Sequence, residues 1–150
     1  MQHRISFDTA LASDADALAS LRVEAMRESL QRVGRFDPQR ARERFLSSFA
    51  PDQTHHIVLG GSKVGFFVVK PEGDGLLLDH LYITPGHQGQ GLGAAALAEV
   101  FSLADQGGLC VRVGALRESD SNRFYARHGF VLVEQAEFDN YHVRRATPAR

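Results

Sequence analysis

The chain has 150 residues, of which 43% are hydrophobic and 23% are charged, and its formal net charge is −1. These proportions are those of one globular domain over residues 1–150, and they exclude the strongly basic face that nucleic acid or an anionic membrane would require. No apolar run is long enough to span a bilayer, and the segment from Met1 to Ser13 is too polar for a signal peptide. Cys110 is the only cysteine, which favours a reducing compartment and indicates no metal site. We therefore expect a cytoplasmic protein without a metal.

The first half of the chain predicts two helices ahead of a hairpin. Ser13 and Asp16 form a variant of the capping box, and apolar residues recur at helical spacing from Leu18 to Val33. Asp37 and Pro38 are typical of a second helix start. Alternation and turn residues predict four more features: a strand over His3 to Phe7, an end of the second helix at Pro51, a hairpin of His56 to Leu59 and Lys63 to Lys70 around Gly60-Gly61, and a turn at Gly73-Asp74-Gly75.

The second half predicts a strand, a helix and a second strand. Leu76 to Thr84 is too hydrophobic for a solvated edge, so we expect it near the centre of a sheet. A helix over Gln90 to Gln106 leads to a buried strand over Leu109 to Leu116, which implies a right-handed crossover between parallel neighbours and places Cys110 in the core. The remaining elements are a short helix over Asp120 to His128 and an antiparallel pair of Phe130 to Glu134 with Tyr141 to Arg145. The fold class is α/β (α+β), a mixed sheet of about six to seven strands flanked by about four helices.

The segment from Gln88 to Ala94 carries the most information about function. A glycine costs about 1 kcal/mol in a helix interior, so Gly89, Gly91 and Gly93 at one helix start indicate that the backbone approaches something closely. Free N–H groups and the helix dipole favour an anion there, which predicts a phosphate cradle; a glycine-rich turn without a ligand is the alternative. No Gly-Lys-Ser/Thr follows, which excludes a Walker loop. Gly91 to Ala96 formally matches the dinucleotide pattern but lacks its acidic partner.

Three segments in this order resemble the motifs of the GNAT superfamily of N-acetyltransferases. They are Gln88-x-x-Gly91-x-Gly93, similar to the family's Gln/Arg-x-x-Gly-x-Gly/Ala signature, the preceding Leu81-x-Ile83-x-Pro85, and Asn122 to Phe130, similar to the family's Phe-Tyr-x-x-x-Gly-Phe. The resemblance covers Leu76 to about Phe130. It implies a GNAT-like fold, acetyl-CoA as cosubstrate, and a small-molecule or peptide amine as acceptor.

The resemblance also implies where the coenzyme lies. The backbone of Tyr82 and Ile83 would line the acetyl and pantetheine arm, and Asn122 would either contact the cofactor or simply start a helix. Strand pairing would open into a notch between Thr84 and Leu116. The diphosphate would lie on the amides of Gln88, Gly89, Gln90, Gly91, Leu92, Gly93 and Ala94.

Acetyl transfer calls for an acid and a base. An alkylamine with a pKa of about 10.4 is protonated at neutral pH, and the thiolate leaving group gains from receiving a proton. Tyr125 matches the family's position for the acid, although an aromatic ring there could instead pack the helix onto the sheet. The base is Asp79 or His80, which alternation points to opposite faces; Asp79 is favoured because an acid in an apolar run needs a partner or a solvent path. Positioning alone provides effective molarities of about 10⁵ to 10⁸ M, so a base is not essential.

The acceptor and the assembly are less constrained. The arginines of the first two helices suit an acidic acceptor, but a solvated face is favoured. We expect direct attack without a covalent enzyme intermediate, and a homodimer through an exposed edge strand is compatible with such folds. Two alternatives are a non-catalytic CoA-binding or regulatory module on the same fold and a small nucleotide-dependent oxidoreductase fragment. The arginines are Arg32, Arg35, Arg40, Arg42 and Arg44.

Overall fold

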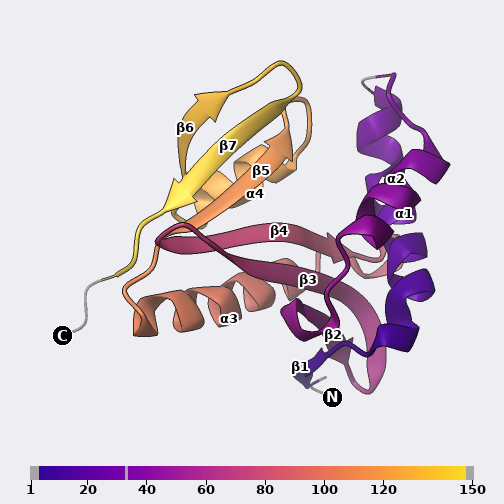
Figure 1. Ribbon diagram of the computed structural model, residues 1–150, viewed down its shortest axis with the longest axis horizontal. Helices are drawn as coiled ribbons and strands as arrows, with labels where there is room; N and C mark the ends of the chain where they lie inside the picture. Colours follow the sequence, from indigo (N-terminus) through magenta and orange to yellow (C-terminus); the bar gives the residue numbers. More distant parts are fainter. Residues whose placement is uncertain (1–3, 33, 148–150) are drawn as a thin grey trace. The chain divides into compact units, whose positions relative to one another are not determined.

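The computed structural model of the protein describes residues 4–32 and 34–147. They form two compact units, unit 1 from Met1–Val68 and His80–Ala95 and unit 2 from Val69–Asp79 and Ala96–Arg150. The elements in chain order are β1 (Ile5–Thr9), η1 (Ala12–Asp14), α1 (Ala15–Arg32), α2 (Pro38–Ser47), η2 (Pro51–Gln53), β2 (Thr54–Leu59), β3 (Ser62–Glu72), β4 (Gly75–Ile83), η3 (Pro85–His87), α3 (Leu92–Gln106), β5 (Val111–Leu116), α4 (Ser121–Arg127), β6 (Val131–Gln135) and β7 (Asp139–Arg144) (Figure 1).

The strands of the described residues form one mixed sheet of seven in the order β1-β2-β3-β4-β5-β7-β6. This confirms the predicted fold class and the central place of β4. The strand predicted from His3 begins at Ile5 and runs to Thr9, antiparallel to β2, and His3 lies outside the described residues. That the chain is one domain over residues 1–150 stays a prediction.

The start of α1 differs from the prediction. Ser13 lies inside the short η1 turn and α1 begins at Ala15, so the predicted capping box at Ser13 is wrong. The carboxylate of Asp14 instead accepts the Leu11 N–H at 2.8 Å. The reason is that the Asp14 side chain, one residue after Ser13, bonds back to the preceding chain before α1 begins. Val33, expected on the apolar stripe, lies outside the described residues.

The second helix and the hairpin in unit 1 follow the sequence pattern. The Asp37 carboxylate accepts the Arg40 N–H at 3.1 Å, and Pro38 is the first residue of α2. Gly60 and Gly61 have φ of 57° and 87° in the β2–β3 turn, a region that favours glycine. Helices α1 and α2 lie beside each other (Figure 1). The core of unit 1 is the cluster of Ala10, Leu18, Ala19, Phe45, Phe66 and Val68.

Unit 2 contains the predicted parallel pair. β4 pairs with β5 from Leu76 opposite Val111 to Leu78 opposite Val113. β5 pairs antiparallel with β7 along its whole length, and β6 with β7. Helix α3 connects the parallel strands and buries Leu97, Val100 and Ala104.

Cys110 is not in the core, contrary to the prediction. The side chain is exposed because β5 begins only at Val111, and Cys110 belongs to the turn that enters the strand. Its carbonyl accepts the Leu76 N–H at 2.8 Å, and a Cβ on Gly75 would lie 2.7 Å from that oxygen. No helix of the described residues is long and apolar enough to cross a membrane.

Two leucines of α3 test how unit 2 is packed. Leu97 is 1% exposed and Leu103 is 48% exposed on the same helix. We predict that Leu97→Ala lowers the free energy of unfolding by about 2–5 kcal/mol because it leaves a cavity, whereas Leu103→Ala changes it by no more than about 0.5 kcal/mol. Urea denaturation measures both. Equal effects of the two substitutions would contradict this assignment of the buried face.

Candidate functional site

The end of β4 lies against a glycine of β3. A Cβ on Gly65 would overlap the carbonyl oxygen of Tyr82 and would lie 3.0 Å from Cδ1 of Ile83. The Thr84 N–H donates to the Val64 carbonyl at 2.9 Å, so the strand stays fixed to β3 up to the loop. Only a residue without a side chain fits at position 65 without a shift. This close approach fixes the backbone of Tyr82 and Ile83, the strand end from which the candidate site begins.

The loop after β4 is closed by its own side chains. The His87 N–H donates to the Thr84 carbonyl at 2.9 Å, and Thr84 Oγ1 lies 3.0 Å from Nδ1 of the same histidine. The Gln88 side chain donates from Nε2 to the Ile83 carbonyl at 3.1 Å. Gln88, the first residue of the glycine motif, therefore binds back to the strand end and helps to set the path of the loop.

The amides from Gln88 to Ala94 donate to no described atom of the protein. Gly89 and Gly91 have φ of 79° and 80°, a conformation that other residues rarely adopt. The first helical bond runs from the Ala95 N–H to the Gly91 carbonyl at 3.0 Å. A row of free donors at the start of a 15-residue helix, with the positive end of its dipole, is an arrangement that binds phosphate groups.

Tyr82 and His80 point to one face of β4, toward the helices of unit 1. The His80 ring packs edge-on against Phe45 at 5.4 Å between centroids, and its Nδ1 lies 3.4 Å from the Tyr82 hydroxyl. That hydroxyl lies 3.3 Å from the sulfur of Met26 on α1. His80, Tyr82 and Met26 are all half-buried, so this aromatic cluster keeps contact with solvent.

Asp79, the neighbour of His80 and the base that the sequence favours, already has a cationic partner. Its carboxylate lies 3.1 Å from Nζ of Lys70, and the two side chains are 29% and 25% exposed. The expectation that this acid finds a partner is confirmed. To take a proton from an amine, however, the carboxylate would have to give up part of its interaction with the lysine.

Tyr125 and Asn122 lie on α4 in unit 2. Tyr125 is 6% exposed, and its ring lies 5.3 Å from that of Phe130. The Asn122 amide donates to the carbonyls of Leu116 and Ser119 at 2.8 and 2.9 Å. These bonds hold the β5–α4 turn. The alternative that Asn122 starts the helix is wrong, because α4 begins at Ser121 with Asp120 as its N-cap and Asn122 lies within the first turn.

A buried polar network on β7 completes the surroundings of Asn122, and sequence reasoning missed it. Asn122 Oδ1 accepts from Asn140 Nδ2 at 3.0 Å and from His142 Nε2 at 3.1 Å. His142 is 4% exposed, its Nδ1 has no partner, and burial lowers its pKa. The ring is therefore neutral and donates from Nε2. Tyr125 packs beside it at 6.3 Å between ring centroids.

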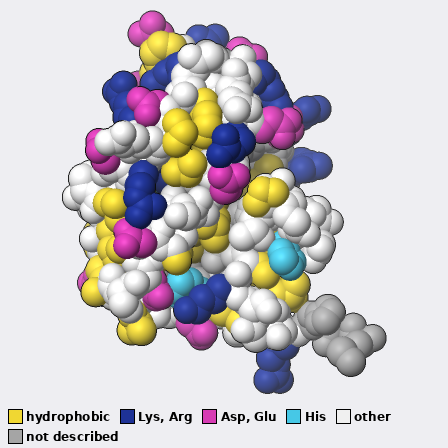
Figure 2. Space-filling model, turned by 90° about the vertical axis from the view of Figure 1, so that its right-hand side faces the viewer, with side chains coloured by type: hydrophobic (Ala, Val, Ile, Leu, Met, Phe, Trp, Pro, Cys, Tyr) yellow, Lys and Arg dark blue, Asp and Glu magenta, His cyan; other side chains and the backbone are white. Residues whose placement is uncertain are grey.

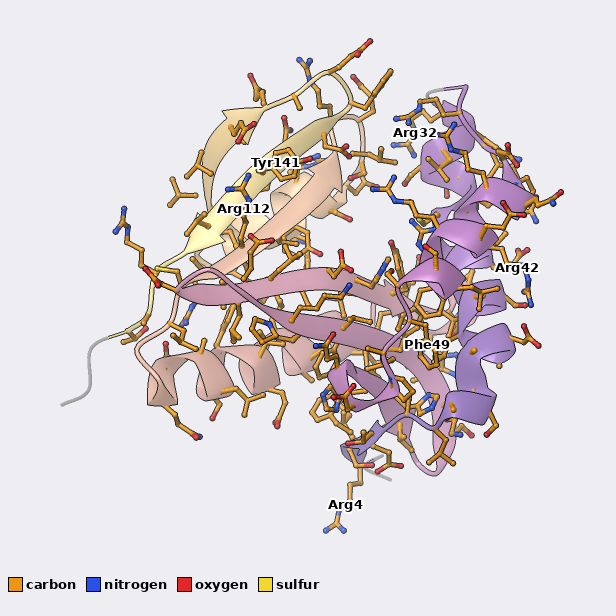
Figure 3. All side chains as sticks on the ribbon, in the orientation of Figure 1. Arg4, Arg32, Arg42, Phe49, Arg112 and Tyr141 are labelled. Atoms are coloured by element: carbon orange, nitrogen blue, oxygen red, sulfur yellow. The ribbon has the colours of Figure 1, made fainter. Side chains whose placement is uncertain are left out.

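Several charged side chains outside these clusters form ion pairs at the surface. Arg32 lies 3.2 Å from Glu28, and Arg42 is paired with Asp16. Figure 2 shows basic and acidic side chains interspersed on the face that it displays. In Figure 3, Arg112 of β5 lies over the ring of Tyr141 of β7, 4.9 Å from its centroid. The described residues contain no group of three or more His, Cys, Asp or Glu side chains that could hold a metal ion.

One family model matches more than half of the chain. The model of the acetyltransferase (GNAT) domain matches residues 51–132. No curated protein sequence matches the chain significantly.

Solved structures share the fold. The PaiA N-acetyltransferase of Thermoplasma acidophilum, in complex with coenzyme A, has a TM-score of 0.78 and 16% identity over 95% of this chain and 99% of its own. An acetyltransferase of Thermus thermophilus has a TM-score of 0.74 and 21% identity over 94% of this chain and 96% of its own. The N-acetylglutamate synthase of Neisseria gonorrhoeae, complexed with coenzyme A and N-acetyl-glutamate, has a TM-score of 0.68 and 17% identity over 98% of this chain and 36% of its own.

The close approach at Gly65 gives a testable prediction. Gly65→Ala forces a Cβ against the Tyr82 carbonyl, whereas a Cβ on Gly86 meets nothing within 4 Å. We predict that Gly65→Ala lowers the free energy of unfolding by about 1–3 kcal/mol and that Gly86→Ala leaves it within about 0.5 kcal/mol. Thermal and urea denaturation measure the difference. A Gly65→Ala protein as stable as the parent would show that the strand end is not held in this way.

Proposed function

This chain belongs to the acetyltransferase (GNAT) domain family, and on that premise we propose that it moves an acetyl group from acetyl-CoA to the nitrogen of an amine by direct attack in a ternary complex. The observation that carries the proposal is the row of amides from Gln88 to Ala94 without a protein acceptor. These donors, with left-handed glycines at 89 and 91, fit a diphosphate. The PaiA structure in complex with coenzyme A has the same fold.

The proposed coenzyme contacts come from consecutive parts of unit 1. Acetyl-CoA, when bound, supplies a thioester whose carbonyl carbon accepts the amine. The amides of Gln88 to Ala94 bind its diphosphate, and the backbone of Tyr82 and Ile83 lines the arm that carries the acetyl group. The contact of Gly65 with the Tyr82 carbonyl keeps that strand end in place. Asn122 stays a proposed cofactor contact by resemblance only, because its amide and oxygen are engaged within unit 2.

Acid and base are assigned to two side chains. We propose His80 as the base in place of Asp79, because the Asp79 carboxylate is already paired with Lys70. In the balanced step the amine nitrogen bonds to the acetyl carbon, the C–S bond breaks, His80 takes the proton from nitrogen, and Tyr125 donates a proton to sulfur. The role of Tyr125 follows from the family motif. Its ring is buried and packs against Phe130.

The proposed setting is a metal-independent reaction in the cytoplasm, with no nucleic acid or membrane partner. A homodimer remains part of the proposal. β6 is the last strand of the sheet, and its residues Val131, Leu132 and Val133 are 65%, 46% and 55% exposed.

The phosphate cradle is tested by glycine substitution. Gly91 and Gly73 both have left-handed backbone with open space around the Cβ position, and Gly73 lies in the β3–β4 turn. Gly91→Val and Gly73→Val should cost similar stability, but only Gly91→Val should weaken coenzyme A binding, by about tenfold or more, because it distorts the donor row. Isothermal titration calorimetry measures the affinity. Unchanged coenzyme affinity in Gly91→Val would remove the basis of the proposed function.

The acid–base assignment predicts a pattern among three variants. His80→Gln and Tyr125→Phe should each lower kcat by about 10² to 10⁴, while Asp79→Asn has a much smaller effect. The pH–rate profile should lose the limb that reports the base in His80→Gln only. Amine pools with acetyl-CoA provide the assay, and coenzyme affinity provides the control because none of the three side chains holds the diphosphate.

Other outcomes would reassign the residues. A loss in Asp79→Asn with an unaffected His80→Gln would return the base to the carboxylate. An unchanged rate in Tyr125→Phe would leave that ring a packing role. Tight coenzyme binding with no turnover on any amine would identify a non-catalytic coenzyme-binding module.

A further inference from the structure

The side chain of Asn122 connects helix α4 to strands β5 and β7 within unit 2. Its Nδ2 donates to the carbonyls of Leu116 and Ser119, which places the amide oxygen on the opposite side because a carbonyl can only accept. Oδ1 accepts there from Asn140 Nδ2 and His142 Nε2 of β7, at 3.0 and 3.1 Å. Both ends of this amide are therefore engaged, one with the end of β5 and the other with β7.

The same arrangement fixes what His142 contributes. Because Asn122 Oδ1 accepts, the proton of the imidazole is on Nε2. Nδ1 is buried and has no hydrogen-bond partner among residues 4–32 and 34–147, so it carries only a lone pair. Burial lowers the pKa of this histidine, which keeps the ring neutral. His142 therefore gives Asn122 one hydrogen bond and no charge.

Helix α4 depends on such connections because it is short. It has seven residues, and the side chain of its N-cap residue, Asp120, makes no capping hydrogen bond to a described residue. A helix of this length is not stable alone in water, so contacts with the rest of unit 2 determine where its residues lie. Asn122, in the first turn, makes two such contacts, with the end of β5 and with β7.

Tyr125 lies one turn after Asn122, on the same face of α4. Its ring centroid lies 6.3 Å from that of His142 and 5.3 Å from that of Phe130. His142 therefore meets α4 at two points, through its hydrogen bond to Asn122 and through its ring beside Tyr125. Because residues three apart in a helix move together, a shift of the asparagine would also shift the tyrosine.

We propose that Asn122 and His142 are positioning residues for Tyr125, the proposed acid. Their hydrogen bond fixes the turn of α4 that carries the phenol, so that the hydroxyl is held in one orientation for transfer of its proton to sulfur. The proposal rests on the proposed acetyl transfer and adds a residue of β7 to its machinery. Neither positioning residue moves a proton. A displacement of a reacting group by about 1 Å can cost about 100-fold in rate, so a hydrogen bond that touches no substrate can still control kcat.

The test is a double-mutant cycle on kcat. His142→Leu removes the donor to Asn122, whereas His142→Gln keeps an N–H donor of similar reach. We expect His142→Leu to lower kcat by about 10- to 100-fold with unchanged acceptor KM and coenzyme Kd, and His142→Gln to recover most of the loss. In a Tyr125→Phe background, which has no phenol to position, His142→Leu should have no further effect. Arg123→Ala, which changes an 84% exposed side chain of α4, should behave as the parent.

A second variant removes the other partner of the hydrogen bond and serves if His142→Leu does not fold. Asn122→Ala should also lower kcat in the parent and leave it unchanged in the Tyr125→Phe background. Equal losses in both backgrounds would make the network a structural connection with no role in positioning the acid. Variants of both residues that are as active as the parent would overturn the proposal as well.

Failure of the acetyl transfer itself gives a different result. If no amine is acetylated, the proposed function fails, and NMR of the tyrosine rings still decides whether the network positions Tyr125. The chain has three tyrosines, so ¹³C-tyrosine labelling gives few signals, and Tyr125→Phe assigns the one of interest. Asn122→Ala should shift the Tyr125 ring signals, and Arg123→Ala should not. Unchanged Tyr125 signals in Asn122→Ala would overturn the proposal.

Discussion

Backbone amides that find no acceptor in the protein are the constraint on which the candidate site depends. A backbone N–H group needs a hydrogen-bond acceptor. For the amides from Gln88 to Ala94, only solvent or a ligand can be that acceptor. Left-handed glycines at 89 and 91 hold the loop in a conformation that side chains would strain. The fold already holds the loop in this conformation, so the binding of an anion requires little further ordering of the loop backbone.

The neighbouring strand end explains why this loop is fixed. Gly65 admits the Tyr82 carbonyl at a distance that any Cβ would prevent, and the Gln88 side chain bonds to the Ile83 carbonyl. One contact comes from the middle of β3 and the other from the loop itself. Together they connect the amide row to the core of unit 1. A substitution at residue 65 is therefore expected to alter the loop conformation even though residue 65 does not contact a ligand.

The sequence predicted the parts of this structure that depend on local rules. The cap at Asp37, the glycine turn at Gly60 and the helix predicted from Gln90, which begins at Leu92, all follow from preferences of a few adjacent residues. The capping box predicted at Ser13 is wrong because Asp14 competes for the same turn. The core position predicted for Cys110 is wrong because an apolar run does not show where a strand begins.

Contacts between distant segments explain what the sequence could not predict. The pairing of Lys70 with Asp79 depends on the β3–β4 turn that brings the two strands together. The network of Asn122 with His142 joins residues 20 positions apart, and no motif marks the closing strand as its partner. Arg22 reads as an ordinary helix residue until α2 covers it. Polar groups of this kind can be identified only once the structure shows that they are buried and therefore need hydrogen-bond partners.

The environment of His80 bears on how much a base must do. The rings of Phe45 and Tyr82 lie beside the histidine, and the carboxylate of the adjacent residue, Asp79, is paired with Lys70. An ammonium placed beside these half-buried rings loses part of its hydration, and loss of hydration favours the neutral amine. In the proposed mechanism the site therefore lowers the pKa of the acceptor itself. The proposed base then has less work to do, and the ion pair of Asp79 with Lys70 keeps that negative charge from stabilising the protonated amine.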